Sequence, residues 1–382
     1  MKFLRLIASC DTRTGGPIAG LLRSSKALAA MGHETHIATL DDPSTDWVKR
    51  SEFKTIALGP SQPIYGYNPR LTDWVVSNAC NYDVAIIHCI WNYISLGSWK
   101  GLRKTGLPYF VFLHGSLDPW HREFYPIKHL FKQAFWLGVE GKVLRDAQKV
   151  LFTSEEERRL AKNAFWGYQN YSCEVVAYGA SNPSGDPTAQ IASFRNFCEL
   201  TRDEPYLLFL SRIHPKKGID SLISAFAKHA PAAMQLVIAG PDQVGLQHEL
   251  MRQAADLGIS NRIKWPGMLE GDLKWGAFRG AQAFVLPSHG ENFGIVLAEA
   301  MACSTPVLTT QKVNIWREIE ASGGGIVVAQ ASDFDDALQA FFQRSPGQID
   351  EMRRQARRCF LDKFEIGQSA SDLLRLAAEA VQ

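Results

Sequence analysis

The sequence has little net charge, no closely paired cysteines and no long apolar run, and each absence excludes a class of protein. Its 382 residues carry 41 Lys and Arg against 39 Asp and Glu, a formal charge of +2, which argues against a polybasic nucleic-acid binder. The seven cysteines are an odd number and none forms a Cys-x-x-Cys pair, so neither a disulfide framework nor a zinc ribbon is expected. No apolar run reaches the roughly 18 residues that a membrane-spanning helix needs.

Targeting and nucleotide-binding signatures are missing as well. The apolar run at Met1–Ala8 is short and Arg5 interrupts it, which does not fit a secretory signal. We therefore expect a cytoplasmic protein in a reducing compartment, with surface attachment to the inner face of a membrane left open. Neither a complete Gly-x-Gly-x-x-Gly nor a Gly-Lys-Ser phosphate loop is present, which weakens the dehydrogenase and NTPase interpretations.

Short apolar runs alternate with helical patterns along the chain. They are rich in Val, Ile, Phe and Leu with little polar alternation, as in strands that are buried on both faces of a parallel sheet. The predicted strands are Phe3–Ala8, Thr35–Leu40, Val84–His88, Tyr109–Leu113, Val150–Thr153, Tyr206–Leu210, Gln235–Ala239, Arg262–Trp265, Ala283–Leu286, Val307–Thr309 and Gly325–Val328. The predicted helices include Ile18–Met31, Ile219–His229, His248–Leu257, Leu273–Gly280 and Ile295–Cys303. The alternation predicts an α/β fold with two Rossmann-like lobes.

The densest cluster of turn residues, Asn182–Pro187, marks the boundary between the lobes. We predict an N-terminal, acceptor-side domain at 1–180, a linker at 181–204 and a C-terminal domain at 205–364. A final segment, 365–382, holds an amphipathic helix that can cap either lobe, and crossing back to the N-terminal domain is one of these options. Two lobes joined by one linker leave a cleft, and ligands of parallel sheets bind at the carboxyl ends of the strands.

Two loops at such strand ends in the first lobe contain candidate residues. Gly15 and Gly16 follow the first strand, and glycines let a backbone approach an anion closely. An ordinary loop before a helix is the alternative. His114 follows the strand Tyr109–Leu113 and can bond a sugar hydroxyl, or it is a structural histidine beside a turn glycine.

A basic turn in the second lobe joins a strand to a helix. Arg212 lies at the end of the strand and Lys217 at the start of the helix. A guanidinium and an ammonium so placed can hold a diphosphate, and the helix N-terminus adds partial positive charge. A solvated basic turn is the alternative.

A pair of glutamates follows the strand Ala283–Leu286. We expect Glu291 on a loop and Glu299 on the following helix. A carboxylate can accept both hydroxyls of a vicinal diol, so each can hold a sugar or a ribose. Glu299 has apolar neighbours, and a charge in that environment needs a partner; otherwise it is a surface helix residue.

Seven residues separate the two glutamates, Phe293-Gly294 lies between them, and Ser288 precedes them. This pattern resembles the signature of the retaining family 4 glycosyltransferases, the glycosyl transferases group 1. Similar pieces recur over most of the chain, at Thr14–Pro17, His114-Gly115, Thr153–Glu155, Ser211-Arg212, Lys217-Gly218 and Ala239-Gly240. The resemblance implies the GT-B fold, in which two Rossmann-like domains with parallel sheets face each other across a cleft.

The resemblance also implies a role for each matching residue. Arg212 and Lys217 would bind the donor diphosphate, Glu299 the ribose, and Glu291 the donor sugar and phosphate. His114 would lie near the transferred sugar, so that Glu291, His114, Arg212 and Lys217 form the catalytic set. Gly16 would approach the phosphates from the first lobe, and the segment 266–269 would contact the base mainly through its backbone. The remaining donor-binding positions are Gly15, Gly240, Met268, Leu269, Asn292, Phe293 and Gly294.

Two positions depart from the family pattern, because Tyr178-Gly179 stands where Asn-Gly is common and Asn292 replaces a common glycine. The resemblance implies retention without a covalent intermediate and without a bound metal or other cofactor. Ser332 and Asp335 are interpreted as a capping box at a helix start, not as part of a metal site.

The segment Trp120–Trp136 interleaves basic and aromatic residues, and residues 100–149 carry nine Lys and Arg against four Asp and Glu. Such a segment suits the surface of an anionic membrane, where lipid-linked acceptors lie. A packed helix with a solvated basic face is the alternative.

The function predicted from the sequence is therefore transfer of a hexose from a nucleotide sugar to a saccharide or lipid-linked acceptor. The residues at 312–319 and those around Trp120 resemble the corresponding segments of bacterial exopolysaccharide-assembly enzymes. This resemblance favours UDP-glucose as the donor and an exopolysaccharide or cell-envelope glycan as the product. The alternatives are a sugar-nucleotide epimerase of the same fold and a non-catalytic sensor of nucleotide sugars. No nucleic-acid partner is expected.

Overall fold

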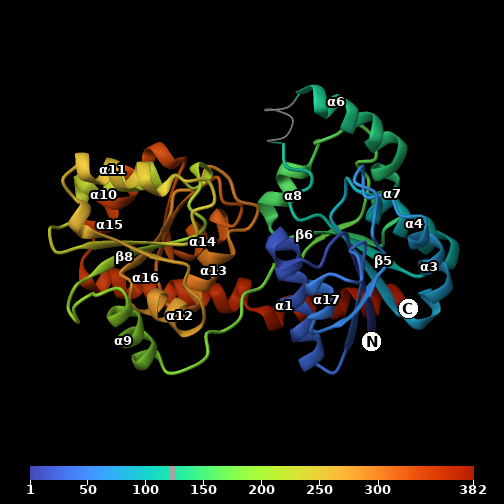
Figure 1. Ribbon diagram of the computed structural model, residues 1–382, viewed down its shortest axis with the longest axis horizontal. Coiled ribbons are helices and arrows are strands. Elements are labelled where there is room, and N and C mark those ends of the chain that lie inside the picture. Colours follow the sequence, from blue (N-terminus) through green and yellow to red (C-terminus); the bar gives the residue numbers. More distant parts are fainter. Residues whose placement is uncertain (120–125) are drawn as a thin grey trace. The chain divides into compact units, whose positions relative to one another are not determined.

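The computed structural model describes residues 1–119 and 126–382, which form two compact units (Figure 1). The first unit comprises 1–179 together with 366–382, and the second comprises 180–365. The chain passes between the units at 179/180 and again at 365/366. Each unit contains one parallel β-sheet, as the buried apolar runs predicted.

The first unit is built on a seven-stranded sheet in the order β3-β2-β1-β4-β5-β6-β7, and its paired strands are parallel. Its strands are β1 Lys2–Ile7, β2 Glu34–Thr39, β3 Lys54–Ala57, β4 Val84–His88, β5 Tyr109–Phe112, β6 Lys149–Phe152 and β7 Cys173–Val175. The sequence did not reveal β3 and β7, because these short edge strands are only partly buried and lack a continuous apolar run.

Helices cover the sheet of the first unit. They are α1 Gly16–Ala30, α2 Asp46–Lys49, α3 Arg70–Asn78, α4 Tyr93–Thr105, α6 Pro126–Phe135, α7 Gly141–Asp146, α8 Glu155–Ala161 and α17 Ile366–Val381. The C-terminal helix α17 packs against α1 (Figure 1). It buries Leu373 and Leu376 in the core of this unit.

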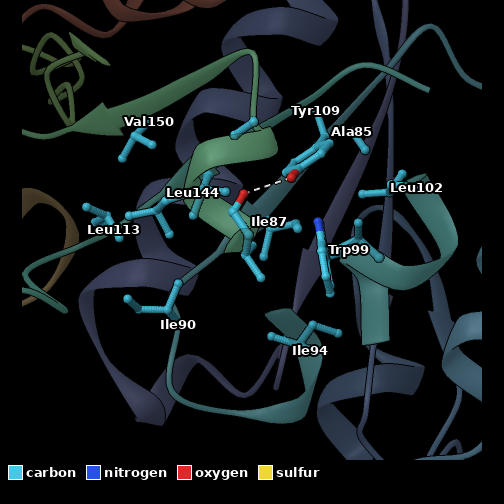
Figure 2. Close-up of a cluster of buried hydrophobic side chains, with 14 of the residues drawn as sticks. Ala85, Ile87, Ile90, Ile94, Trp99, Leu102, Tyr109, Leu113, Leu144 and Val150 are labelled. Atoms are coloured by element: carbon cyan, nitrogen blue, oxygen red, sulfur yellow. Dashed lines mark hydrogen bonds between the residues drawn. The ribbon is translucent and has the colours of Figure 1, made fainter. Parts of the chain in front are cut away.

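An apolar core lies between the strands β4, β5 and β6 and the helices α4 and α7 (Figure 2). Ile87 and Val150 from the strands meet Ile94 and Leu144 from the helices there. The hydroxyl of Tyr109 donates a hydrogen bond of 2.7 Å to the Val143 carbonyl, so this buried polar group is satisfied. The core therefore fixes the carboxyl ends of β4 and β5.

The second unit has a six-stranded sheet in the order β10-β9-β8-β11-β12-β13, and its paired strands are parallel. Its strands are β8 Tyr206–Leu210, β9 Gln235–Ala239, β10 Ile263–Gly267, β11 Ala283–Leu286, β12 Val307–Thr310 and β13 Gly325–Val328. Its helices are α9 Pro187–Phe197, α10 Ile219–His229, α11 Gln247–Asp256, α12 Gly271–Gly280, α13 Ile295–Ala302, α14 Trp316–Ser322, α15 Phe334–Phe342 and α16 Pro346–Cys359. All six predicted strands of this half are present.

The segment 181–204, predicted as a linker, is instead part of the second unit. It contains α9, whose N-terminus is capped by the Asp186 carboxylate, and α9 packs against α12 with Phe194 fully buried. The turn residues at Asn182–Pro187 mark a helix start. Composition alone could not distinguish that from a boundary between domains.

The predicted capping box at Ser332 is also wrong in detail. The helix α15 begins at Phe334, but its N-cap is Asp333, which makes no side-chain capping bond. Asp335 pairs instead with Lys228 at 2.6 Å. Among the described residues, no helix combines the length and the apolar character that crossing a bilayer requires.

Glu140 is a fully buried carboxyl in the core of the first unit. It lies in a π-helical turn, Trp136–Glu140, and one oxygen accepts hydrogen bonds from the Trp91 amide and the Ser95 hydroxyl, at 3.0 and 2.9 Å. Burial raises the pKa of Glu140 to about 7 from a usual value of 4.5. The folded chain therefore keeps a proton that the unfolded chain releases.

We predict that Glu140 makes the first unit less stable as the pH rises from about 4.5 to about 7. In this window the unfolded state binds fewer protons, so raising the pH favours unfolding, by about 3 kcal/mol in all. Glu140→Gln keeps the shape and should remove this loss. Hydrogen exchange of β4 and β5 amides in urea, at about pH 5 and about pH 8, measures the difference. Equal pH dependence in the two proteins would contradict the prediction.

Candidate functional site

The candidate site of the second unit lies where β8 and β11 end side by side in the sheet. The loop after β8 carries Arg212 and Lys217, and the loop after β11 carries Glu291. Gly218 brings the two loops together: its φ is +67°, and a Cβ there would lie 2.2 Å from the Pro287 carbonyl oxygen. Only glycine fits such a position.

Lys217 and Glu291 form an ion pair across these two loops. The side chains of Lys217 and Glu291 are 9% and 20% exposed, so the pair is largely shielded from water. The Ser288 hydroxyl donates a 3.0 Å hydrogen bond to the same Glu291 oxygen. A buried ammonium needs a counter-charge, and here the carboxylate predicted to bind the donor sugar provides it.

Arg212 lies in the same connection but is exposed to solvent. Its guanidinium donates to the Gln243 side chain at 3.1 Å. The backbone beside it is fixed by Gly240, because a Cβ at residue 240 would lie 1.8 Å from the Ser211 carbonyl oxygen. Gly240 therefore serves the close approach of β8 and β9, and Arg212 remains able to reach a ligand.

Glu299 lies on α13 and is 9% exposed. Its required partner is Lys274 of α12, whose Nζ lies 2.7 Å from a Glu299 carboxylate oxygen. Sequence reasoning missed Lys274, because nothing in the primary sequence relates the faces of two separate helices. Gly294 caps α13 with a φ of +74°, and a Cβ there would lie 2.6 Å from Val313.

The remaining predicted residues of the second unit differ in access. The Met268 side chain is exposed, whereas Leu269 is buried and can offer a ligand only its backbone. Phe293 is also buried and contacts Phe364 edge to face. The Asn292 side-chain oxygen accepts from Asn314 at 3.5 Å.

In the first unit, Gly15 and Gly16 form the exposed N-terminus of α1. Gly15 has a φ of +113°, and no atom lies within 4 Å of its Cβ position. The backbone conformation at residue 15 therefore requires glycine, although no neighbouring atom would clash with a side chain there. The space beside Gly15 is open to a ligand.

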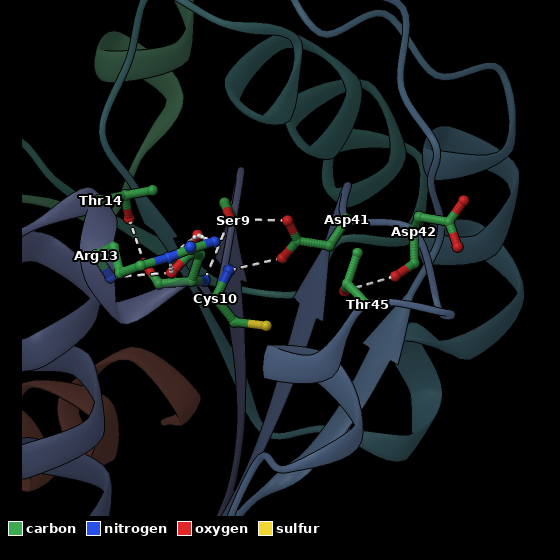
Figure 3. A network of polar contacts seen from close by, with 8 residues as sticks. Ser9, Cys10, Arg13, Thr14, Asp41, Asp42 and Thr45 are labelled. Atoms are coloured by element: carbon green, nitrogen blue, oxygen red, sulfur yellow. Dashed lines mark hydrogen bonds and ion pairs between the residues drawn. The ribbon is translucent and has the colours of Figure 1, made fainter.

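A polar network holds the loop before α1 (Figure 3). The Asp41 carboxylate accepts from the Ser9 hydroxyl and the Cys10 amide, both at 2.7 Å, and so ties the loop after β1 to the end of β2. Asp11 caps the following turn and pairs with Arg13 at 2.8 Å.

His114 follows β5 with a φ of +52°. Its Nε2 is 2.8 Å from Nδ1 of His88, and its ring stacks on Phe112. Burial, and then the charge of Arg5, lower the pKa of His114 to about 3, so the ring is neutral at physiological pH. His88 and Arg5 were not among the predicted site residues, because they lie inside apolar strands.

Both halves of the chain match known families. The model of the glycosyl transferase 4-like domain matches residues 15–179, and that of the glycosyl transferases group 1 matches residues 191–358. A D-inositol 3-phosphate glycosyltransferase of Nocardia farcinica is 30% identical over 225 residues, 56% of this chain and 48% of that protein. Another, from Frankia alni, is 36% identical over 170 residues, 41% of this chain and 40% of that protein. The chain spans about half the length of the curated relatives it matches.

Solved structures share the fold over the whole chain. Anabaena HepE in complex with UDP has a TM-score of 0.79 and 19% identity, covering 99% of this chain and 100% of that one. Sucrose-phosphate synthase from Thermosynechococcus elongatus has a TM-score of 0.76 and 20% identity, covering 99% of both chains. The predicted GT-B fold is confirmed, and with its two units matched in turn, the chain belongs to the glycosyl transferases group 1 family with a glycosyl transferase 4-like domain.

Proposed function

We propose that the chain transfers a hexose from a nucleotide sugar, with UDP-glucose as first choice, to a saccharide or lipid-linked acceptor. The product would be an exopolysaccharide or a cell-envelope glycan. The observation that carries the proposal is the shielded Lys217–Glu291 pair at the joined ends of β8 and β11. Relatives support it: Anabaena HepE has been solved with UDP and with UDP-glucose.

Lys217 is suited to bind the diphosphate because its charge is already desolvated. A phosphate that enters the second unit can share this ammonium with Glu291, while the exposed Arg212 supplies a second cation. As the sugar–phosphate bond breaks, negative charge grows on the leaving diphosphate, and fixed positive groups stabilise it. Glu291 is then free to accept hydroxyl hydrogens of the donor sugar.

We propose a retaining reaction in which the departing phosphate takes the proton of the acceptor, without a metal. A chelator should accordingly leave turnover unchanged. The curated relatives are named D-inositol 3-phosphate glycosyltransferases, which adds an inositol phosphate to the acceptors worth testing.

Thermal shift against a panel of nucleotide sugars tests the proposal, because a ligand that binds only the folded chain raises the melting temperature. Turnover of the stabilising donor separates the transferase from a sensor. Dependence on an acceptor, with the anomeric configuration retained in the product, separates it from an epimerase. If no nucleotide sugar stabilises the chain, the proposal fails.

We predict that Lys217→Ala lowers turnover about 10²- to 10³-fold, because the variant loses a preorganised charge at the leaving group. The control is Lys228→Ala, which removes an exposed lysine of the same unit that pairs with Asp335. Steady-state kinetics with the donor found above gives the ratio. Full turnover in Lys217→Ala with unchanged donor affinity would refute the assignment.

We predict that Glu299→Gln raises the donor KM about tenfold or more with little change in kcat. The reason is that a ribose diol would lose a charged acceptor in both the ground and the transition state. Glu249→Gln changes an exposed glutamate on α11 and is the matched control. An unchanged KM in Glu299→Gln would remove the residue from the ribose site.

We also propose contact with an anionic membrane through the first unit. Residues 120–125 of the predicted segment lie outside the described residues, but α6 presents Ile127, Leu130 and Phe131, each at least 70% exposed. Trp166, 77% exposed, lies beside this helix, because Gln133 bonds the Trp166 amide and carbonyl at 2.8 and 2.9 Å. The helix carries two lysines and no acidic residue. Exposed apolar side chains with cations suit an anionic interface.

We predict that replacing both Phe131 and Trp166 by Ser lowers co-sedimentation with anionic vesicles at least about tenfold, because two apolar side chains no longer insert. Val244 and Met251, exposed in the second unit, are replaced by Ser as the control. Equal sedimentation of the two double variants, or no binding by the parent, would end this proposal.

A further inference from the structure

Arg5 is a fully buried arginine that forms no ion pair with a carboxylate of the described residues. It lies in the middle of β1, is 0% exposed, and donates to the Ser24 hydroxyl at 3.4 Å and to Nε2 of His88 at 3.5 Å. Burial lowers the pKa of Arg5 to about 9, so the guanidinium stays charged at neutral pH. A buried charge without a counter-ion costs stability, which suggests that the position has another use.

The guanidinium fixes the direction of a chain of hydrogen bonds. Arginine has only donors, so Nε2 of His88 must accept, and a neutral His88 then carries its proton on Nδ1. That nitrogen lies 2.8 Å from Nε2 of His114, which must accept in turn. The proton of a neutral His114 is therefore on Nδ1.

Both rings are held neutral and in place. Burial lowers the pKa of His88 well below its usual value, with the charges of His114 and Arg5 acting in the same direction. The planes of the two imidazoles lie within 11° of each other with ring centres 5.1 Å apart, which suits the N–H···N bond between them, and His114 stacks on Phe112 at 4.5 Å. The Nδ1 of His114 is buried and has no hydrogen-bond partner within the part of the chain that the structure describes. The series of hydrogen bonds from Arg5 through His88 thus ends at the Nδ1–H of His114, which is an unused donor.

We propose that Arg5 and His88 are positioning residues that fix His114 as its Nδ1–H tautomer, so that His114 serves a bound saccharide as a hydrogen-bond donor and never as a base. The role at the saccharide rests on the proposed function, whereas the tautomer does not. His114 and His88 line a cavity of about 10 Å³, which holds about one water and no sugar ring. A hydroxyl oxygen therefore reaches the Nδ1–H only after a local movement of the His114 ring or its cover.

Long-range ¹H–¹⁵N spectra of the full chain labelled in histidine test the tautomer without any ligand. The expected result is Nδ1–H for both His88 and His114. Finding Nε2–H on His114 overturns the proposal, whether or not the chain is a transferase.

Variants then test the cause. Arg5→Met removes the donor and should release the His88 tautomer, whereas Arg5→Lys keeps a donor and should preserve it. Ser24→Ala removes only the other partner of Arg5 and should change neither ring. Should Arg5→Met fail to fold, His88→Phe interrupts the series of hydrogen bonds between Arg5 and His114. His88→Gln, whose side chain can both accept and donate, should restore the Nδ1–H state of His114. Unchanged tautomers in the variant that interrupts this series would overturn the positioning role.

Turnover connects the tautomer to function. If the wild type transfers sugar, the variant that loses the tautomer should lower kcat about 10- to 100-fold, by analogy with the loss seen when the hydrogen-bond partners of metal-binding histidines are removed. Arg5→Lys and Ser24→Ala should keep the wild-type kcat. Lost tautomer with full turnover overturns the role at the saccharide and leaves the transferase proposal intact. A wild type without turnover instead refutes the proposed function, and the spectra still decide the tautomer.

Discussion

The pairing of Lys217 with Glu291 is the interaction on which the second unit's site depends. An ammonium that is shielded from water is stable only beside a negative charge, and in this chain that charge is supplied by a loop 74 residues away. The pair holds the connections after β8 and β11 together. In the proposed function a phosphate would share this ammonium with the carboxylate. The same contact would then serve both the packing of the two loops and the binding of the donor.

Glycines make this arrangement sterically feasible. At Gly240 and Gly218 a single added carbon would collide with the carbonyl oxygens of Ser211 and Pro287. These are contacts of backbone with backbone, which cannot move aside as a flexible side chain can. The close approach of β8 to its neighbours therefore depends on residues that carry no chemistry themselves.

The two units treat charge differently. In the second unit the buried Lys217 and the partly exposed Lys274 each face a carboxylate. In the first unit Arg5 is surrounded by a hydroxyl, an imidazole and apolar side chains, so its charge is not neutralised locally. An ion pair can be opened by a competing anion, whereas an unpaired guanidinium imposes a lasting direction on the hydrogen bonds around it. The first arrangement suits ligand exchange, and the second suits a fixed orientation.

The sequence by itself determined the strands that are buried on both faces of a sheet, because their residues must be apolar. Runs such as Val84–His88 and Tyr206–Leu210 fall on β4 and β8 without shift, whereas the partly buried edge strands β3 and β7 have no such run. Its motifs also singled out Lys217, Glu291 and Glu299. Only the tertiary structure decided which polar groups meet: Lys274 with Glu299 across two helices, and Arg5 with the neutral His88 across 83 residues. It also assigned α9 to the second unit and α17 to the first. Local composition sets what a segment can form, but partners far apart in the chain are chosen by packing, which no local pattern encodes.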